Sequence, residues 1–213
     1  MATTKIGVWN AALDELGHRP LSDTGEPVEA GRVLTRRYDR VVADCLADAS
    51  WNFAMETIKA TSDTGVTPAF GYPEVFAKPS DWVRTIGVSM DEYFAYPLLR
   101  YYDDANFWSA DSSPVYIRYV SNDTGLGMDL TRWTSSFTRY VELELAHRAW
   151  RINNDKSLRE EIGKMRDRAR KLAKNHDAMN EATVKFPPPS SWTRARWGNG
   201  GGDDRGSRGS LTG

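Results

Sequence analysis

Two pairs of adjacent carboxylates, set among aromatic side chains, are the residues of this sequence whose types could support chemistry. The pairs are Asp91-Glu92 and Asp103-Asp104, and the runs beside them are rich in tyrosine, phenylalanine and tryptophan. Glycoside hydrolases use two carboxyl groups that flank the scissile bond, one of which acts as the acid. The pattern is therefore compatible with hydrolysis of a cell-wall glycan. Adjacent acidic residues are also common in solvated turns, where they form a negatively charged surface.

Other patterns for catalysis or metal binding are absent from the sequence. It contains no glycine-rich phosphate loop, no nucleophile elbow and no H-E-x-x-H motif. The three histidines, His18, His147 and His176, are far apart, and their positions suit packing. Cys45 is the single cysteine, so an internal disulfide or a cysteine cluster cannot form. We predict no catalytic site, no cofactor and no metal, with Cys45 as a buried, inert thiol.

Composition describes an ordinary globular chain whose charges are sorted along its length. The 213 residues carry a formal net charge of −1, and 40% of them are hydrophobic. The net charge is −2 over residues 1–60, −5 over 61–133 and +6 over 134–213. No stretch is long and apolar enough to cross a bilayer, and we expect no secretory signal and no membrane partner. The near-neutral total excludes bulk electrostatic attraction to nucleic acid.

The last residues have a composition that cannot form a core of their own. Residues 186–213 hold seven glycines, four serines and a run of three prolines. Such a segment buries too little apolar surface to offset the entropy of ordering it. It also carries tryptophan and arginine, the residue types that dominate interface energetics. We predict an extended arm that docks on a partner through Pro187, Pro188, Trp192, Arg194, Arg196 and Trp197.

Hydrophobic spacing and turn residues predict the elements that must position these groups. Apolar residues three and four apart indicate helices at 4–16, 28–49, 137–152 and 156–180. Short aromatic and β-branched runs indicate strands at the positions Trp82–Val88, Tyr96–Tyr102 and Val115–Val120.

We therefore predict an α+β fold that is mainly helical. N-terminal helices (1–60) and C-terminal helices (134–185) form a helical bundle, and a small antiparallel β domain (61–133) is inserted between them. The extended arm (186–213) follows the bundle.

The last predicted helix carries a seam with a period of 3.5 residues. This heptad seam consists of Leu158, Ile162, Met165, Ala169, Leu172, His176 and Met179. An intramolecular hairpin with the preceding helix is its favoured use, and a seam between subunits is the alternative.

Five strings, in order along residues 5–180, resemble the phage head-to-tail adaptor proteins, also called tail tubular protein A. The resembling strings are Ala12–Leu21 (A-L-x-x-L-G-x-R-P-L in that family), Cys45–Ala54 (L-x-x-x-x-W-N-F-A), Lys78–Arg84 (L-P-x-D-x-x-R), Tyr116–Val120 (I-x-Y-x) and Phe137–Trp150 (F-x-x-A-L-x-x-x-L-A). The residues Val141-Glu142-Leu143 depart from the small residues usual there, and the segment after 186 matches no motif of the family.

The resemblance implies a virion structural protein rather than an enzyme. Members of that family form a twelve-fold ring beneath the portal of a short-tailed phage, after assembly in the host cytoplasm. Their C-terminal arms run onto the portal, a tail nozzle binds below, and DNA passes through the lumen. The expected homo-oligomer gives three sets of site residues. The arm residues would bind the portal; Trp9, Leu158, Ile162, Met165 and Leu172 would form ring interfaces; and Asp91, Glu92, Asp103 and Asp104 would line the channel, where like charge keeps DNA from adhering.

Two other functions remain open at the level of sequence. One is a virion-associated hydrolase of cell-wall glycan that uses the acidic pairs. The other is a connector or completion protein of a long-tailed phage, which would have the same chemistry and different partners.

Overall fold

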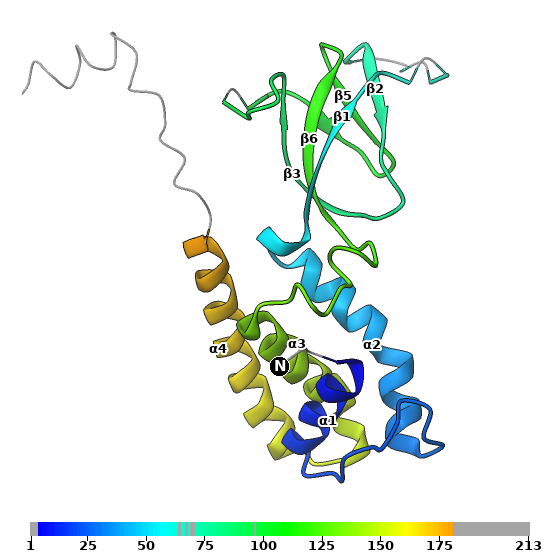
Figure 1. Ribbon diagram of the computed structural model, residues 1–213, viewed down its shortest axis with the longest axis vertical. Helices are drawn as coiled ribbons and strands as arrows, with labels where there is room; N and C mark the ends of the chain where they lie inside the picture. The colour runs from blue at the N-terminus through cyan, green and yellow to red at the C-terminus, as the bar shows by residue number, and fades with distance from the viewer. Residues whose placement is uncertain (1–3, 64, 67, 69–70, 96, 181–213) are drawn as a thin grey trace, which may run out of the picture. The chain divides into compact units, whose positions relative to one another are not determined.

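The computed structural model describes residues 4–63, 65–66, 68, 71–95 and 97–180, which form a mixed α+β fold (Figure 1). The helices are α1 (Lys5–Glu15), α2 (Glu29–Ala47), α3 (Ser135–Ala149) and α4 (Lys156–Asn180), with short 3-10 helices η1 (Asn52–Ala54) and η2 (Trp150–Ile152). The strands are β1 (Met55–Ala60), β2 (Glu74–Ala77), β3 (Trp82–Ser89), β4 (Tyr102–Asp103), β5 (Phe107–Ala110) and β6 (Val115–Ser121). The predicted α+β class, with antiparallel pairing, is confirmed.

Local hydrogen bonds explain where the first helix begins and ends. At the start of α1, the Thr4 hydroxyl accepts a hydrogen bond from the Gly7 amide (3.2 Å), which satisfies one of the free N–H groups of the first turn. At its end, Gly17 has a positive φ of 65°, and the His18 amide donates to the Leu13 carbonyl (2.9 Å). A residue with a Cβ adopts that backbone conformation less readily, so Gly17 ends α1 where the sequence places the turn.

Helix α3 lies at the centre of the helical part, in contact with α1, α2 and α4 (Figure 1). Its apolar residues are distributed around the whole helix, which suits an element that is covered on several sides. Side chains from the three longest helices and from α1 share one core, which includes Leu13, Leu34, Val42, Phe137 and Leu145.

The packing of α4 on α3 confirms the intramolecular hairpin and corrects the predicted seam. The first four seam positions, Leu158 to Ala169, pack against the core as expected. Beyond Ala169 the buried positions are Ala173 and Asp177, whereas Leu172 is 52% exposed and Met179 is 81% exposed. A straight α-helix repeats every 3.6 residues, so a stripe of period 3.5 drifts away from the packed face within a few turns.

The six strands form two antiparallel sheets, each with three strands. One sheet has the order β1-β6-β3 and the other has the order β2-β5-β4. A second core joins them, with Val88 and Ile117 from the first sheet against Phe76 and Trp108 from the second. The β region thus has its own apolar interior, separate from that of the helices.

The strand predictions were correct at two positions and wrong at a third. Strands β3 and β6 confirm the predictions for Trp82–Val88 and Val115–Val120. The predicted strand ran from Tyr96 to Tyr102. Among its described residues, 97–102, only Tyr102 belongs to a strand, and Pro97 forms an isolated bridge with Ser89. Proline lacks the amide proton that a continuous ladder needs, which explains why pairing does not extend from Pro97.

Candidate functional site

Helix α2 presents a group of arginines on one side. Arg36 and Arg37 each lie three or four residues from both Val33 and Arg40, so these side chains are neighbours on the helix surface. Together with the turn after α3, this face of α2 encloses a pocket of about 1030 Å³, which we call the arginine pocket. Its lining consists of His18, Arg19, Val28, Glu29, Ala30, Val33, Arg36, Arg37, Arg40, Val41, Arg148, Arg151 and Ile152.

Positive charge dominates the arginine pocket. Six arginines line it, against Glu29 as the single carboxylate of the lining. Arg36 approaches Glu29 at 3.6 Å, and Arg19 pairs with Glu26, which lies outside the lining. The lining has one carboxylate for six arginines, and that carboxylate already lies close to Arg36. The lining as a whole therefore keeps an excess of positive charge.

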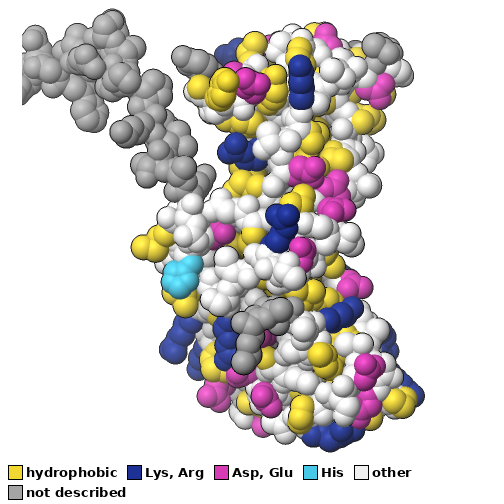
Figure 2. All heavy atoms as spheres, in the orientation of Figure 1, with side chains coloured by type: hydrophobic (Ala, Val, Ile, Leu, Met, Phe, Trp, Pro, Cys, Tyr) yellow, Lys and Arg dark blue, Asp and Glu magenta, His cyan; other side chains and the backbone are white. Residues whose placement is uncertain are grey.

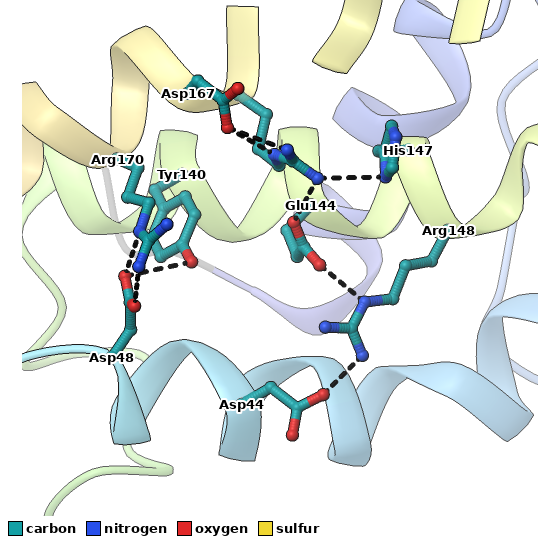
Figure 3. Close-up of polar contacts among 9 residues, drawn as sticks. Asp44, Asp48, Tyr140, Glu144, His147, Arg148, Asp167 and Arg170 are labelled. Carbon is teal, nitrogen blue, oxygen red and sulfur yellow. Dashed lines mark hydrogen bonds and ion pairs between the residues drawn. The ribbon is translucent and has the colours of Figure 1, made fainter. Parts of the chain in front are cut away.

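An ion network anchors one wall of the pocket to the rest of the helical part (Figure 3). The Arg148 guanidinium donates to Glu144 on its own helix and to Asp44 on α2. Glu144 is in turn 3.5 Å from Arg166 of α4, so this carboxylate links α3 with α4. Burial alone would lower the pKa of Arg148, but its bonds to Asp44 and Glu144 outweigh this effect and raise that pKa.

A second group of the network surrounds Asp48, at the end of α2. Its carboxylate accepts hydrogen bonds from Arg170 and from the Tyr140 hydroxyl, which is 3.4 Å away (Figure 3). The same carboxylate pairs with Lys174 at 3.0 Å. Burial would raise the pKa of Asp48, but the two cations of α4 outweigh it and lower that pKa. The network therefore fixes α2, α3 and α4 to one another with charges that stay ionised at neutral pH.

The chemistry that this arrangement offers is the binding of anions. Guanidinium groups remain protonated at any physiological pH, so they cannot act as general bases, but they bind carboxylates and phosphates through paired N–H groups.

Burial strongly raises the pKa of the Cys45 thiol, which keeps this side chain protonated in the core. Within the described part of the chain, no three histidine, cysteine or acidic side chains lie close enough to hold a metal ion.

The acidic pairs predicted from the sequence belong to the β region, where two of their four carboxylates have partners. Asp91 follows β3 and accepts hydrogen bonds from the Ser89 hydroxyl (2.7 Å) and the Ala95 amide (2.9 Å). Asp103 of β4 forms an ion pair with Lys78. Glu92 and Asp104 are exposed. Asp91-Glu92 lie in the turn after β3 of one sheet, and Asp103-Asp104 lie at β4 of the other.

Figure 2 shows how charged side chains are distributed on one face of the molecule, which can be compared with the predicted acidic channel wall. Acidic and basic side chains are interspersed there over both the helical part and the β region. A continuous negative surface is not seen on that face.

The predicted ring-interface residues divide into three classes by burial. Trp9 is 1% exposed and Ile162 is fully buried, so both side chains belong to the core of the protomer. Leu158 and Met165 are half-buried against the same core, and Leu172 is exposed. All six arm residues, Pro187, Pro188, Trp192, Arg194, Arg196 and Trp197, lie outside the described residues.

The pocket that the arginines of α2 line was not predicted from the sequence. Arg36, Arg37 and Arg40 are off the apolar stripe, which is visible in the sequence and also typical of any solvated helix face. The pocket needs Arg148 and Arg151, more than a hundred residues away, and only the contact of α3 with α2 brings them close.

Comparison with known proteins adds no family assignment. No protein-family model matches the chain, and none of the curated proteins is significantly similar to it. In the described residues, no helix is both long and apolar enough to cross a membrane.

Proposed function

We propose that this protein is a phage head-to-tail adaptor: a virion structural protein that forms a ring between the portal and the tail nozzle. In this proposal the helices form a bundle with an inserted β domain, and the arm from residue 186 docks on the portal. DNA passes through the ring without specific binding, and the protein has no catalytic role.

The observation that carries the proposal is where the resembling strings fall in the fold. Ala12–Leu21 contains Gly17, which ends α1, and Cys45–Ala54 covers the passage from α2 into β1. In that passage the Trp51 indole is fully buried and donates to the Cys45 carbonyl (2.9 Å), while Asn52 bonds to Asp177 of α4. These two strings thus mark residues that join elements, as expected of proteins that share an architecture rather than an active site, whereas Tyr116–Val120 lies within β6 and Phe137–Trp150 runs along α3.

The side-chain chemistry of the described residues also supports a structural role. Asp91 and Asp103, the carboxylates that a glycan hydrolase would need, are engaged in a turn and in an ion pair. We therefore favour the adaptor over the hydrolase.

For the ring interface we propose the exposed side of α4. Leu172 and Met179 are large apolar side chains on the surface of the protomer, and α4 is the helix that leads into the arm. Leu158 and Met165 are half-buried on the same helix and could extend this contact. A ring needs two different faces on each protomer, because its contacts are head-to-tail.

The test is assembly on a portal ring, followed by electron microscopy and mass measurement. We expect the full chain to dock, and we expect removal of residues 186–213 to abolish docking while the remaining chain stays folded. Replacing Trp192 and Trp197 together with alanine should weaken docking by about 2–4 kcal/mol per arm, and many arms on one ring amplify the effect. Normal docking by the arm-deleted protein would refute the proposed role of the arm.

A further inference from the structure

Three arginines of the arginine pocket have no acidic partner within the described part of the chain. They are Arg37, Arg40 and Arg151; the other three, Arg19, Arg36 and Arg148, each approach a carboxylate. The Arg37 guanidinium instead donates to the backbone carbonyl of Arg148, which fixes its position at the wall. Cations gathered in this way repel one another, and a bound anion would relieve that repulsion.

The same pocket has an apolar component. Val28, Val33 and Ile152 are half-buried and contribute aliphatic surface to its lining, whereas Ala30 and Val41 are buried in the core behind them. Its volume of about 1030 Å³ is at the upper end of the range for ligand pockets, so it has room for several side chains and not only for one small ion. A ligand that fills it must combine negative charge with aliphatic or aromatic groups.

We propose that the arginine pocket is a docking site for an acidic peptide segment of another protein, with an apolar anchor between its carboxylates. The lining has six side chains that are positively charged at any physiological pH. All six are arginines, and none is a lysine. Arginine forks match the geometry of carboxylates and form two parallel hydrogen bonds with each. The anchor would occupy the aliphatic floor, where its burial adds to the affinity.

Nucleic acid fits this pocket less well than a peptide does. Single strands are bound through aromatic side chains on which bases stack, and no aromatic residue lines the pocket. The phosphate backbone of a duplex supplies negative charge but nothing to cover the valines.

A second copy of this chain is also a poorer ligand. Its acidic residues Asp91 and Asp103 already have partners in the β region. Its exposed pair Glu160-Glu161 lies between Arg159 and Lys164 on α4, so that surface is not acidic overall. Glu92 and Asp104 of the acidic pairs are exposed, however, so self-association through the pocket is an outcome that the test must distinguish.

The test measures binding of a fluorescent synthetic peptide, Asp-Glu-Leu-Phe-Asp-Glu, to the full-length protein by anisotropy. We expect saturable binding that weakens as salt is added, because the arginines are partly exposed. The double variant R40E/R151E should bind at least about tenfold more weakly. The matched control is R168E/K171E, which changes the net charge equally at two exposed positions of α4 and should leave the affinity within about twofold.

Two further probes test whether the apolar anchor of the peptide contributes to binding. A peptide with Gly-Ser in place of Leu-Phe should bind about tenfold more weakly, and the V33S variant should weaken only the peptide that has the anchor. Circular dichroism of each variant checks that it is folded.

Each of the following outcomes would overturn the proposal. These are no saturable peptide binding, equal loss in the pocket and control variants, or tighter binding of a short DNA duplex that depends on the same arginines. Self-association of the protein through the pocket would also overturn it. The measurement does not require a ring or a portal, so its result is independent of the adaptor proposal.

Discussion

Asp177 is a buried residue near the end of α4 whose carboxylate accepts a hydrogen bond from the backbone of the distant residue Asn52. It is 6% exposed, and its carboxylate accepts from the Asn52 amide at 3.0 Å. The Asn52 side chain returns a hydrogen bond to the Asp177 carbonyl at 2.7 Å. This reciprocal pair fixes the start of the β region against α4.

We predict that Asp177→Ala destabilises the protein by about 1–3 kcal/mol, because the Asn52 amide loses its acceptor in a poorly solvated place. The measurement is the free energy of unfolding in urea. Asn175→Ala, at an exposed position two residues earlier on α4, is the control and should change it by less than about 0.5 kcal/mol. Equal effects of the two substitutions would contradict the role of Asp177.

The half-buried ring of His147 makes stability depend on pH. Burial, and then the nearby Arg166, lower the pKa of His147 in the folded protein. Arg166 lies 3.2 Å from Nδ1 of the ring and, as an obligate donor, requires that nitrogen to accept (Figure 3). The unfolded chain takes up a proton near pH 6.5 and the folded chain does so only at lower pH, so acidification through about 6.5 costs stability.

We expect His147→Gln to reduce the loss of stability between about pH 7.5 and pH 5.5, because glutamine cannot be protonated there. Urea unfolding at both pH values measures the difference. An identical loss in the variant and the original protein would exclude His147 as its source.

Single residues with strong local rules could be predicted from the sequence, and residues that depend on distant partners could not. Gly17 as a helix end and Cys45 as a core thiol follow from spacing and residue type alone, and the structure confirms both. The ion pair of Asp103 with Lys78 depends on how β4 lies beside the residues after β2, which no local pattern encodes.

At the level of elements, the helices were predictable because each carries a long amphipathic or apolar pattern. The predicted helix at 156–180 coincides with α4, and the one at 28–49 exceeds α2 by one or two residues at each end. Strands β1, β2 and β5 have four to six residues and were missed, since such short runs have no periodicity that excludes other structures.

The corrected register of α4 gives a direct prediction. Ile162→Ala should cost about 2–5 kcal/mol of unfolding free energy, because Ile162 is fully buried. Leu172→Ala should cost less than about 0.5 kcal/mol, because its side chain is outside the packed stripe. Comparable losses would restore the heptad seam as the packed face of the protomer.

The loop between β6 and α3 contains a glycine that has no space for a side chain. A Cβ at Gly127 would lie 2.1 Å from the Ser121 carbonyl oxygen and 3.0 Å from the Leu46 side chain. Gly127→Ala should therefore destabilise the protein by about 1–3 kcal/mol or more. The control is Gly87→Ala, where a Cβ meets no described atom within 4 Å, and thermal unfolding of the two variants should differ accordingly. If Gly127→Ala unfolds at the same temperature as the original protein, the loop can move away from the added Cβ.

At the scale of the whole molecule, the sequence indicated the order of the parts and the α+β class but not the surfaces. The net charge of −5 over residues 61–133 suggested a negative wall, yet its acidic residues are distributed over two sheets and several turns. Net charge sums over a segment, whereas a surface potential depends on which side chains lie next to each other.

Ring assembly can be tested apart from folding through the exposed side of α4. Leu172→Glu should leave unfolding unchanged and reduce the fraction of rings seen by microscopy on a portal, because it places a charge in the proposed interface. Lys171→Glu, an exposed neighbour with a larger change of charge, is the control and should assemble normally. Normal assembly of the Leu172→Glu protein would remove this side of α4 from the interface.

The bond between Asn52 and Asp177 joins residues that are 125 positions apart, and it sits three residues before the end of α4. Tension along the chain from beyond Asn180 reaches α4 at that last turn. The hydrogen bonds at Asp177 would carry part of the tension directly to η1, which leads into β1. A force on the C-terminal segment would thus reach the residues just before β1 without first unwinding the rest of α4.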